Sequence, residues 1–209
     1  ALSVLLLLLV LAPAVDPDGI DLVTGALDAE TTAAAKALAE NYPDIPFPSG
    51  WKANIRGIDL NLQYPAGWST AREIKFAAGY TRPGPRDYVG PAPLVAPESL
   101  AMYGFTRALD PLLTLSYHTQ GRVIYPGGRD IDPPGAKNLA EQFSEASGYA
   151  VEDVPPESSN AGFKDWFLRR FHRPGFTIEA GLGENPLPPS ALDGLCAELF
   201  PLFVTAMQW

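Results

Sequence analysis

The feature that most limits the fold is an almost unbroken apolar run from Val4 to Ala12. It is shorter than the roughly 18 apolar residues that a helix needs to cross a bilayer. Together with Pro13 and Ala14 it imitates the core and cleavage site of a signal peptide, but no Lys or Arg precedes it. We favour a buried strand in the middle of a sheet that helices cover on both faces. We therefore expect the chain to begin inside a fold.

Alternating strand and helix patterns follow this run and predict an α/β layered fold. A Pro- and Gly-rich stretch that extends to Pro93 is expected to be a long functional loop. Gly148 lies where a left-handed residue would end a helix, and we expect Ser190 to cap the last helix and Pro201 to kink it. Helices are expected over 31–40, 97–109, 139–146, 164–172 and after 190. A pair of strands is expected over 112–118 and 122–125, separated by a break at Gly121, and a further strand over 176–179.

Composition limits the partners of this chain. Its 209 residues are 46% hydrophobic and 19% charged, which suits one compact domain over residues 1–209 with a sizeable core. The formal net charge of −9 argues against a nucleic-acid or anionic-membrane surface, because either partner would need clustered Lys and Arg. Basic peptides remain compatible as substrates. Cys196 is the single cysteine, so an internal disulfide is excluded and the redox compartment stays open.

Two residues at predicted strand ends are candidates for chemistry. His118 and His172 are the only histidines, and neither belongs to an HExxH or HxxE motif. His118 ends an apolar strand, at the edge where open α/β sheets bind their ligands. Glu179 ends another, where a carboxylate costs desolvation unless it is paired or used. From these residues alone, a hydrogen-bonded structural histidine is the commoner case and a metal ligand is the alternative.

Several segments, taken in order, resemble the zinc carboxypeptidase family of the carboxypeptidase A-like type. They are P-A-V-D-P-D-G at 13–19, K-A-N-I-R-G-I-D-L-N at 52–61, Y-V-G-P-A-P at 88–93 with Pro97-Glu98 behind it, and the strand ends L-S-Y-H-T at 115–119 and F-T-I-E at 176–179. The resemblance extends over nearly the whole chain, from residue 13 past residue 179. It implies an α/β fold of three layers, with a mixed central sheet flanked by helices and without the N-terminal elements of the family.

The resemblance also implies roles for individual residues. His118 matches the third zinc ligand. Glu179 matches the general base, whose carboxylate takes a proton from the zinc-activated water and passes it to the leaving amine. Lys52 stands where the family has an Arg that stabilises the developing oxyanion, and it keeps the charge without the planar fork. Asn61 matches a substrate-binding Asn. Asp59 matches a carboxylate that orients a zinc-binding His.

Departures from the family pattern are equally informative. The HxxE pair that supplies the first two zinc ligands is absent from this chain, so its Zn²⁺ site is expected to be incomplete. Leu62 replaces the Arg that clamps a free C-terminal carboxylate, a bidentate contact that Leu cannot make. Leu168 takes the approximate place of the family's phenolic Tyr. Substrate binding is assigned to Asn61, Thr119 and the Leu62 position.

Within the family, the strings DLNLQYPAGW, YHTQGRVIYP and GFTIEAGLGENPLP resemble bacterial peptidases that hydrolyse γ-D-glutamyl–meso-diaminopimelate bonds of murein peptides. The resemblance implies a zinc metallopeptidase with a murein peptide as substrate. No nucleic-acid partner and no membrane span are expected from the net charge and from the length of the apolar run, and the localisation, bacterial cytoplasm or cell envelope, stays open. Two alternatives stay open. One is a non-catalytic remnant, or a peptide-binding pseudoenzyme, of the same fold. The other is an ordinary metallocarboxypeptidase, which Leu62 disfavours.

Overall fold

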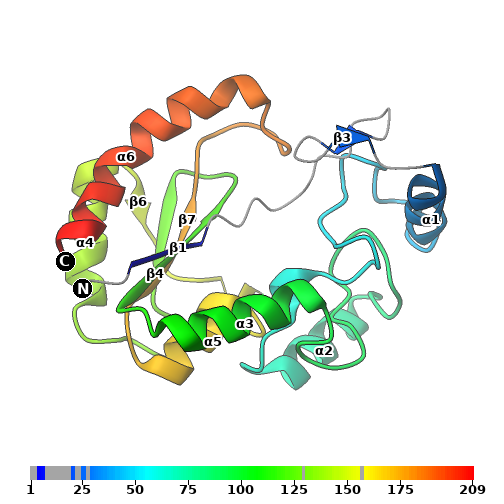
Figure 1. Ribbon diagram of the computed structural model, residues 1–209, viewed down its shortest axis with the longest axis horizontal. Helices are drawn as coiled ribbons and strands as arrows, with labels where there is room; N and C mark the ends of the chain where they lie inside the picture. The colour runs from blue at the N-terminus through cyan, green and yellow to red at the C-terminus, as the bar shows by residue number, and fades with distance from the viewer. Residues whose placement is uncertain (1–3, 8–19, 22–24, 27–28, 129, 156–157) are drawn as a thin grey trace. The chain divides into compact units, whose positions relative to one another are not determined.

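The computed structural model describes residues 4–7, 20–21, 25–26, 29–128, 130–155 and 158–209 (Figure 1). Residue contacts group into two compact units. The first unit comprises residues 1–10, 105–159 and 164–209, and the second comprises residues 11–104 and 160–163. Each unit is described by itself, and the expectation of a single domain stays a prediction. The P-A-V-D-P-D-G segment lies outside the described residues.

A five-stranded mixed sheet forms the centre of the first unit, with the strand order β1-β4-β7-β5-β6 (Figure 1). The strands are β1 (Val4–Leu7), β4 (Leu113–His118), β5 (Val123–Pro126), β6 (Ala150–Val151) and β7 (Gly175–Glu179). β1, β4 and β7 run parallel, β5 runs antiparallel to β7, and β6 runs parallel to β5. The mixed sheet that the sequence predicts is therefore present.

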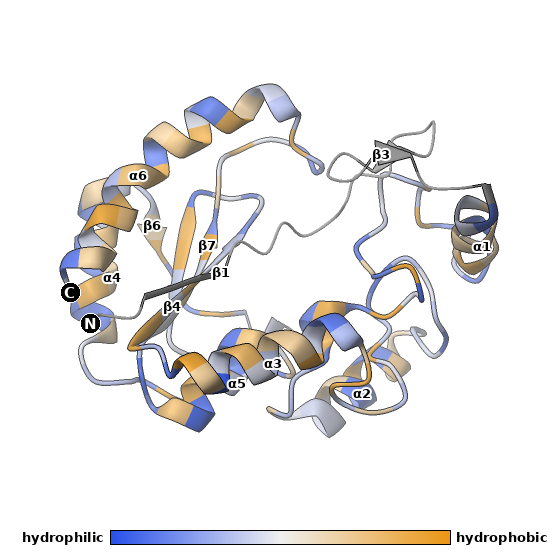
Figure 2. Cartoon of the chain, viewed as in Figure 1, coloured by the Kyte–Doolittle hydropathy of each residue, from blue (hydrophilic) through white to orange (hydrophobic). Residues whose placement is uncertain are grey.

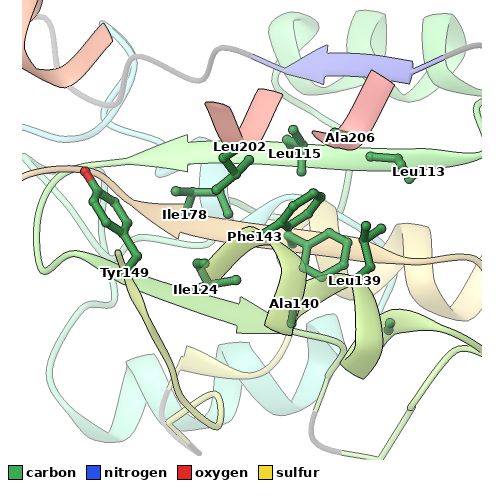
Figure 3. Packing of buried hydrophobic residues seen from close by; sticks show 12 residues of the cluster. Leu113, Leu115, Ile124, Leu139, Ala140, Phe143, Tyr149, Ile178, Leu202 and Ala206 are labelled. Atoms are coloured by element: carbon green, nitrogen blue, oxygen red, sulfur yellow. The ribbon is translucent and has the colours of Figure 1, made fainter. Parts of the chain in front are cut away.

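One face of this sheet is apolar and packs against α4 (Ala136–Ser147) and α6 (Leu192–Gln208). Leucines and aromatic rings from strands and helices interdigitate there (Figure 3), and the rings of Phe143 and Phe176 meet edge to face at 4.9 Å between centroids. The buried members are Leu113, Leu115, Ile124, Ala136, Leu139, Ala140, Phe143, Tyr149, Phe176, Ile178, Leu202 and Ala206. Burial of this cluster supplies the main hydrophobic stabilisation of the first unit.

The opposite face of the sheet packs against α5 (Phe163–Phe171). A Cβ placed on Gly175 of β7 would lie 3.0 Å from the Oγ1 of Thr114 and 3.2 Å from the Cδ1 of Phe167, so the helix approaches the strands closely. Because side chains alternate along a strand, Thr114, Ser116 and Thr177 face α5. Helices on both faces of the sheet give the three layers expected from the sequence.

The second unit contains helices and irregular backbone, with one short antiparallel strand pair. Its elements are β2 (Ile20–Asp21), β3 (Gly25–Ala26), α1 (Ala29–Ala39), the 3-10 turn η1 (Leu60–Leu62), α2 (Trp68–Ala77) and the first part of α3 (Pro97–Leu109), which continues into the first unit. Two small apolar clusters hold it together. One is built around Trp51 with Ala35, Ala39 and Ala53, and the other consists of Leu62, Ala71, Val89 and Ala161.

Gln63 ties the segment from Val89 to Ala96 to η1. Its side chain is fully buried, its Nε2 donates to the carbonyl of Val89 at 2.6 Å, and its Oε1 accepts from the backbone N–H of Ala96 at 3.0 Å. Gly90 adopts a φ of 80°, and a Cβ there would lie 2.8 Å from the Gln63 amide nitrogen. The glycine of the Y-V-G-P-A-P segment is therefore needed both for its backbone conformation and for the room it leaves.

Several sequence-based expectations are confirmed with small shifts of their ends. The helices expected over 31–40, 97–109, 139–146 and 164–172 correspond to α1, α3, α4 and α5. Gly148 ends α4 with a left-handed φ of 74°. The expectation of one uninterrupted loop as far as Pro93 is wrong, because α2 forms inside it. Apolar packing of Ala71 and Trp68 against Leu62 and Val89 stabilises α2 there.

Three further expectations are corrected by the sheet and by α6. β4 and β5 do not pair with each other, because β7 lies between them and bonds to both. Within the described sheet β1 lies at the edge, with β4 on one side, and the rest of the apolar run, residues 8–12, falls outside the described residues. Ser190 does not cap α6, because it lies inside the 3-10 turn η3 (Pro189–Ala191) and Ala191 is the N-cap; α6 then runs through Pro201.

Of the described helices, the stretch Pro189–Gln208 is long and apolar enough to cross a membrane by length and composition alone, with a mean hydropathy of 1.4. Apolar positions recur along α6 in Figure 2. Leu202 and Ala206 are its buried side chains and belong to the core cluster against α4, whereas Leu192 and Phe200 are exposed. Within the first unit this helix acts as a covering layer of the sheet.

Replacing Gln63 by Met should lower the free energy of unfolding by about 1–3 kcal/mol, because the buried Ala96 N–H loses its acceptor and the Val89 carbonyl keeps only its bond from the Trp68 indole N–H. Chemical denaturation of both variants measures this. Gln142→Met is the matched control, since Gln142 is exposed on α4, and it should change stability by less than about 0.5 kcal/mol. Equal effects of the two substitutions would contradict a tethering role for Gln63.

Candidate active site

His118 and Glu179 are neighbours at the carboxyl ends of two parallel strands. They are register partners in the β4–β7 ladder, so their Cα atoms face each other across adjacent strands. Residues paired directly in a parallel ladder point to the same face of the sheet. The backbone N–H of Ala180 donates to the carbonyl of His118 at 2.7 Å and holds the two strand ends together. Both side chains are half-buried.

The face on which Glu179 lies carries a buried cation. Lys164, at the start of α5, is 8% exposed, and its Nζ donates to the carbonyl of Tyr125 at 3.2 Å. Burial lowers the pKa of Lys164 to about 8, while the negative charges of Asp165 and Glu179 act in the opposite direction. The pKa of Tyr125 is raised by burial and by the carboxylates of Glu152 and Glu179. Lysine, phenol and carboxylate thus share one electrostatic environment.

The same face is polar further down β4. The hydroxyls of Thr114 and Ser116 are buried and bond to none of the described residues. Buried polar atoms without partners are costly, so a row of them is unusual in a sheet that serves packing alone. This side of the sheet is therefore more polar than the face under α4 and α6, and it is the side on which His118 and Glu179 lie.

The turn beyond Thr119 is fixed by bonds to the chain beyond Glu179. The N–H of Gly121 donates to the carbonyl of Gly181 at 2.8 Å, and the side-chain amide of Asn185 donates to the carbonyl of Thr119 at 2.8 Å. Gly181 and Asn185 thus help to fix the turn that follows β4, and Thr119 itself is exposed.

In the second unit, Asp59 organises the segment that contains Lys52 and Asn61. It is 2% exposed, and its two carboxylate oxygens accept from the backbone N–H groups of Asn61 at 3.1 Å and Asp87 at 3.0 Å. The backbone N–H of Lys52 donates to the carbonyl of Pro85 at 2.7 Å. Asp59 therefore has a structural task in fixing the backbone beside Asn61, in addition to the orienting role that the sequence suggests.

Leu62 is buried at 9% exposure in the apolar cluster with Ala71, Val89 and Ala161. Its side chain packs inside the second unit. A core residue thus fills the position that the sequence resemblance matches to a carboxylate clamp, and both that match and the assignment to substrate binding stay predictions.

The candidate site residues fall in two groups. His118, Thr119 and Glu179 belong to the first unit, and the β4–β7 pairing brings the histidine and the glutamate together. Lys52, Asp59, Asn61 and Leu62 belong to the second unit, where they share one segment. The convergence of both groups on one cleft stays a prediction.

Among the described residues, no group of three or more His, Cys, Asp or Glu side chains could hold a metal ion. His118 lies where a single ligand of a zinc site would be expected, next to a carboxylate suited to proton transfer. One imidazole does not hold catalytic zinc, which takes three protein ligands. The described residues therefore fit part of a zinc site and not a whole one.

The sequence profile described as zinc carboxypeptidase matches residues 6–201, which is most of the chain. The chain belongs to the zinc carboxypeptidase family. The strand ends with His118 and Glu179 lie inside the matched region, and so does the segment from Lys52 to Leu62.

Two relatives extend the match in sequence. The chain is 45% identical over 197 residues to γ-D-glutamyl-L-diamino acid endopeptidase 1 of Lysinibacillus sphaericus, which covers 94% of this chain and 48% of that protein. It is 40% identical over 182 residues to the uncharacterized protein YqgT of Bacillus subtilis (strain 168), which covers 85% of this chain and 46% of that protein. The chain thus spans about half the length of the curated relatives it matches.

The fold of this zinc carboxypeptidase family member is also found among solved structures. Carboxypeptidase A from Helicoverpa armigera superposes with a TM-score of 0.58 at 16% identity, covering 72% of this chain and 41% of that one. Bovine thrombin-activatable fibrinolysis inhibitor superposes with a TM-score of 0.55 at 17% identity, covering 71% and 55%. At these identities the likeness establishes the fold alone, and it confirms the predicted fold class.

Sequence reasoning missed two residues near Glu179. The sequence predicts a helix that begins at Lys164 and a strand that ends at Tyr125, and it assigns neither residue to the site. A signal for Lys164 exists in hindsight: it stands among Phe163, Trp166 and Phe167, where a helix buries most of its surface. Tyr125 carries no local signal, because its proximity to Glu179 arises from the pairing of β5 with β7.

Lys164 predicts a distinct pH dependence of stability. Its pKa of about 8 in the folded chain lies below the usual 10.5, so the unfolded chain holds this proton more tightly. The penalty for burying the ammonium is complete below pH 8 and is relieved as the pH rises towards 10.5. The difference amounts to about 3 kcal/mol.

Lys164→Met should therefore raise the free energy of unfolding at pH 7 and remove this contribution above pH 8. Urea unfolding of the wild type and the variant between pH 6 and 10 checks it. The exposed Lys36, changed to Met, provides the matched control and should leave the pH profile unaltered. A Lys164→Met profile parallel to that of the wild type would show that the amine is not desolvated.

The incomplete ligand set predicts weak metal binding. Zinc added to the purified 209-residue chain should not bind stoichiometrically, because His118 alone cannot supply the affinity of a three-ligand site. Calorimetric titration and metal analysis after dialysis measure this, with His118→Ala as the comparison. Tight binding at one zinc per chain would mean that the ligands have been misassigned, and His172 or Cys196 would then be tested.

Proposed function

We propose that this chain forms part of the catalytic domain of a zinc peptidase that hydrolyses γ-D-glutamyl–diaminopimelate bonds of murein peptides. The observation that carries the proposal is the pairing of His118 with Glu179 at the ends of β4 and β7, in a chain 45% identical to a γ-D-glutamyl-L-diamino acid endopeptidase. Residues outside this chain would supply the remaining zinc ligands. The proposal concerns the whole enzyme, of which His118 and Glu179 are two components.

Glu179 is the general base and acid of the proposed mechanism. Its carboxylate accepts a proton from the attacking water and delivers it to the amine that leaves when the amide bond breaks. His118 would be one ligand of the zinc, which supplies Lewis-acid activation when it is bound in a complete site. The shared register of the two strands keeps the carboxylate beside the imidazole during this proton transfer.

Charged and polar groups of the second unit would stabilise the reacting amide. Lys52 offers a positive charge for the oxyanion that develops on the scissile carbonyl. Asn61, whose backbone N–H is held by Asp59, would bind substrate through its side-chain amide. Thr119, exposed beside His118, would contribute a further polar contact. This part of the proposal depends on the two groups of residues meeting at one cleft.

The identity of residue 62 supports endopeptidase rather than carboxypeptidase specificity. A buried Leu cannot form a bidentate contact with a free carboxylate, so recognition of a C-terminal residue lacks its usual anchor. Hydrolysis would then not require a free α-carboxylate beside the scissile bond. An ordinary metallocarboxypeptidase is correspondingly disfavoured.

A non-catalytic peptide-binding protein of the same fold is the second candidate. The observation in its favour is that the described residues offer one zinc ligand and no group of three. The two candidates differ in what precedes this chain in its gene product: an HxxE pair supports the enzyme, and its absence supports the binding protein.

The test uses the longest open reading frame that contains this chain, purified with zinc. A murein tripeptide with a γ-D-glutamyl–diaminopimelate bond should be cleaved in preference to a free-carboxyl peptide of the same length. Glu179→Gln should lower kcat by about 10²–10⁴-fold, because it removes the proton acceptor. Its zinc content should equal that of the wild type, since no ligand is changed. Chromatographic product analysis and metal analysis measure the two effects.

Glu184→Gln is the matched control, because Glu184 lies on the exposed turn after β7 and should leave kcat unchanged. Cleavage of only the free-carboxyl peptide would overturn the endopeptidase specificity. Zinc binding and peptide binding without any cleavage would favour the non-catalytic alternative.

A further inference from the structure

Several hydrogen bonds hold the turn that follows Glu179. Ala180 donates to the carbonyl of His118 at 2.7 Å, and Gly181 accepts from the N–H of Gly121 at 2.8 Å. Gly181 adopts a left-handed φ of 72°, and a Cβ there would lie 2.5 Å from the Cδ2 of Leu195. Glycine is needed at this point, two residues beyond Glu179. The backbone on the carboxyl side of Glu179 therefore has little freedom.

Tyr149 supplies the remaining bond to this turn. Its hydroxyl accepts from the N–H of Gly181 at 3.0 Å and donates to the Oε2 of Glu198 at 2.9 Å. The tyrosine is 1% exposed, and its ring belongs to the core cluster between the sheet and the helices. Figure 3 shows the hydroxyl oxygen at the end of the ring, beside the chain that leaves β7. A buried hydroxyl with both a donor and an acceptor partner is fixed in direction.

Glu198 and Arg122 complete a closed set of contacts. Arg122 donates through Nη2 to the Oε1 of Glu198 at 2.5 Å and through Nε to its Oε2 at 3.3 Å, and its guanidinium lies 5.7 Å from the centroid of the Tyr149 ring. The hydrogen bonds from Arg122 and Tyr149 hold the pKa of Glu198 below its usual value. Arg122 directly follows Gly121, the residue bonded to Gly181.

These contacts form a ring that joins the segment following His118 to the segment following Glu179. The path leads from Gly181 through the Tyr149 hydroxyl, the Glu198 carboxylate and Arg122, and returns to Gly181 through Gly121. Arg122 has a φ of 54°, an uncommon conformation for a residue other than glycine, and its side chain is bonded to Glu198. Packing of the Tyr149 ring does not require the hydroxyl, so its bonds serve the turn.

We propose that Tyr149 is a positioning residue for Glu179. Through its hydroxyl it fixes the peptide groups that follow the glutamate and thereby the direction in which the carboxylate points, with Glu198 and Arg122 holding the hydroxyl in place. The catalytic consequence rests on the role proposed above for Glu179, whereas the structural part is independent of it. A shift of about 1 Å in a reacting group is enough to lower a rate about 100-fold.

Tyr149→Phe tests the structural part in the 209-residue chain, because it keeps the ring in the core and deletes only the hydroxyl. Amide hydrogen exchange followed by NMR should show Gly181 exchanging at least about 10-fold faster, since its N–H loses its acceptor. Amides of Leu115 and Ile178 in the sheet centre should keep their rates. Tyr117→Phe is the matched control, because Tyr117 packs against the same cluster and the Gly181 N–H donates to Tyr149 instead.

The catalytic part is measured in the longest open reading frame described above, with zinc bound. Tyr149→Phe should lower kcat about 10-fold and change KM by less than about twofold, because a misdirected base matters in the transition state more than in binding. Glu198→Gln should lower kcat less than Tyr149→Phe does, since its amide oxygen still accepts from the tyrosine hydroxyl. A merely structural role would lower the amount of folded enzyme and leave kcat per active site unchanged.

Each outcome supports or overturns the proposal. Faster exchange at Gly181 together with a lower kcat supports it. Unchanged exchange at Gly181 overturns it, and so does faster exchange with an unchanged kcat. If the wild type cleaves no peptide, the proposed function fails by itself, and the exchange rate of Gly181 then decides whether Tyr149 holds the turn.

Discussion

The parallel hydrogen-bonding of β4 to β7 is the interaction on which the candidate site depends. Its register places His118 opposite Glu179, and because the side-chain period of a strand is two, both residues point to the same face. A slip of one residue would turn Glu179 towards the apolar cluster, where an unpaired carboxylate is costly. The hydrophobic residues between the two strand ends, Leu115 and Ile178 among them, therefore protect the register through their burial.

The two faces of the sheet carry different energetic tasks. Leucine and phenylalanine side chains under α4 and α6 stabilise the first unit by removing apolar surface from water. The face towards α5 holds hydroxyls and the ammonium of Lys164, which is costly to bury. The stabilisation from apolar burial on one face offsets the cost of burying polar groups on the other face. Tyr149 lies on the apolar side. Its hydroxyl contacts the turn beyond Glu179 at the ends of the strands, where it accepts from the N–H of Gly181.

In the second unit, Leu62, on which the proposed specificity rests, is also part of the packing. A residue that cannot clamp a carboxylate is also a member of the cluster that holds α2. Its neighbour Gln63 anchors the segment from Val89 to Ala96, and Asp59 fixes the backbone of Asn61. The segment with the most family resemblance is therefore held from within by buried polar contacts. In the proposed function, the substrate preference would follow from the core residue at this position in place of a ligand-binding one.

The sequence by itself determined the features that depend on local order: most of the helices, the strand ends at His118 and Glu179, and the glycine that ends α4. Local periodicity shows which face of one element is apolar, but not which element it meets. The tertiary structure alone decided that β7 separates β4 from β5, that α2 forms inside a Pro- and Gly-rich stretch, and that Lys164 and Tyr125 lie near Glu179. It alone also joined Tyr149 to Gly181 and Arg122 to Glu198, pairs 32 and 76 residues apart in the chain. Such pairs have no signature in either partner's neighbourhood, because the partners meet only when the fold brings distant segments of the chain together.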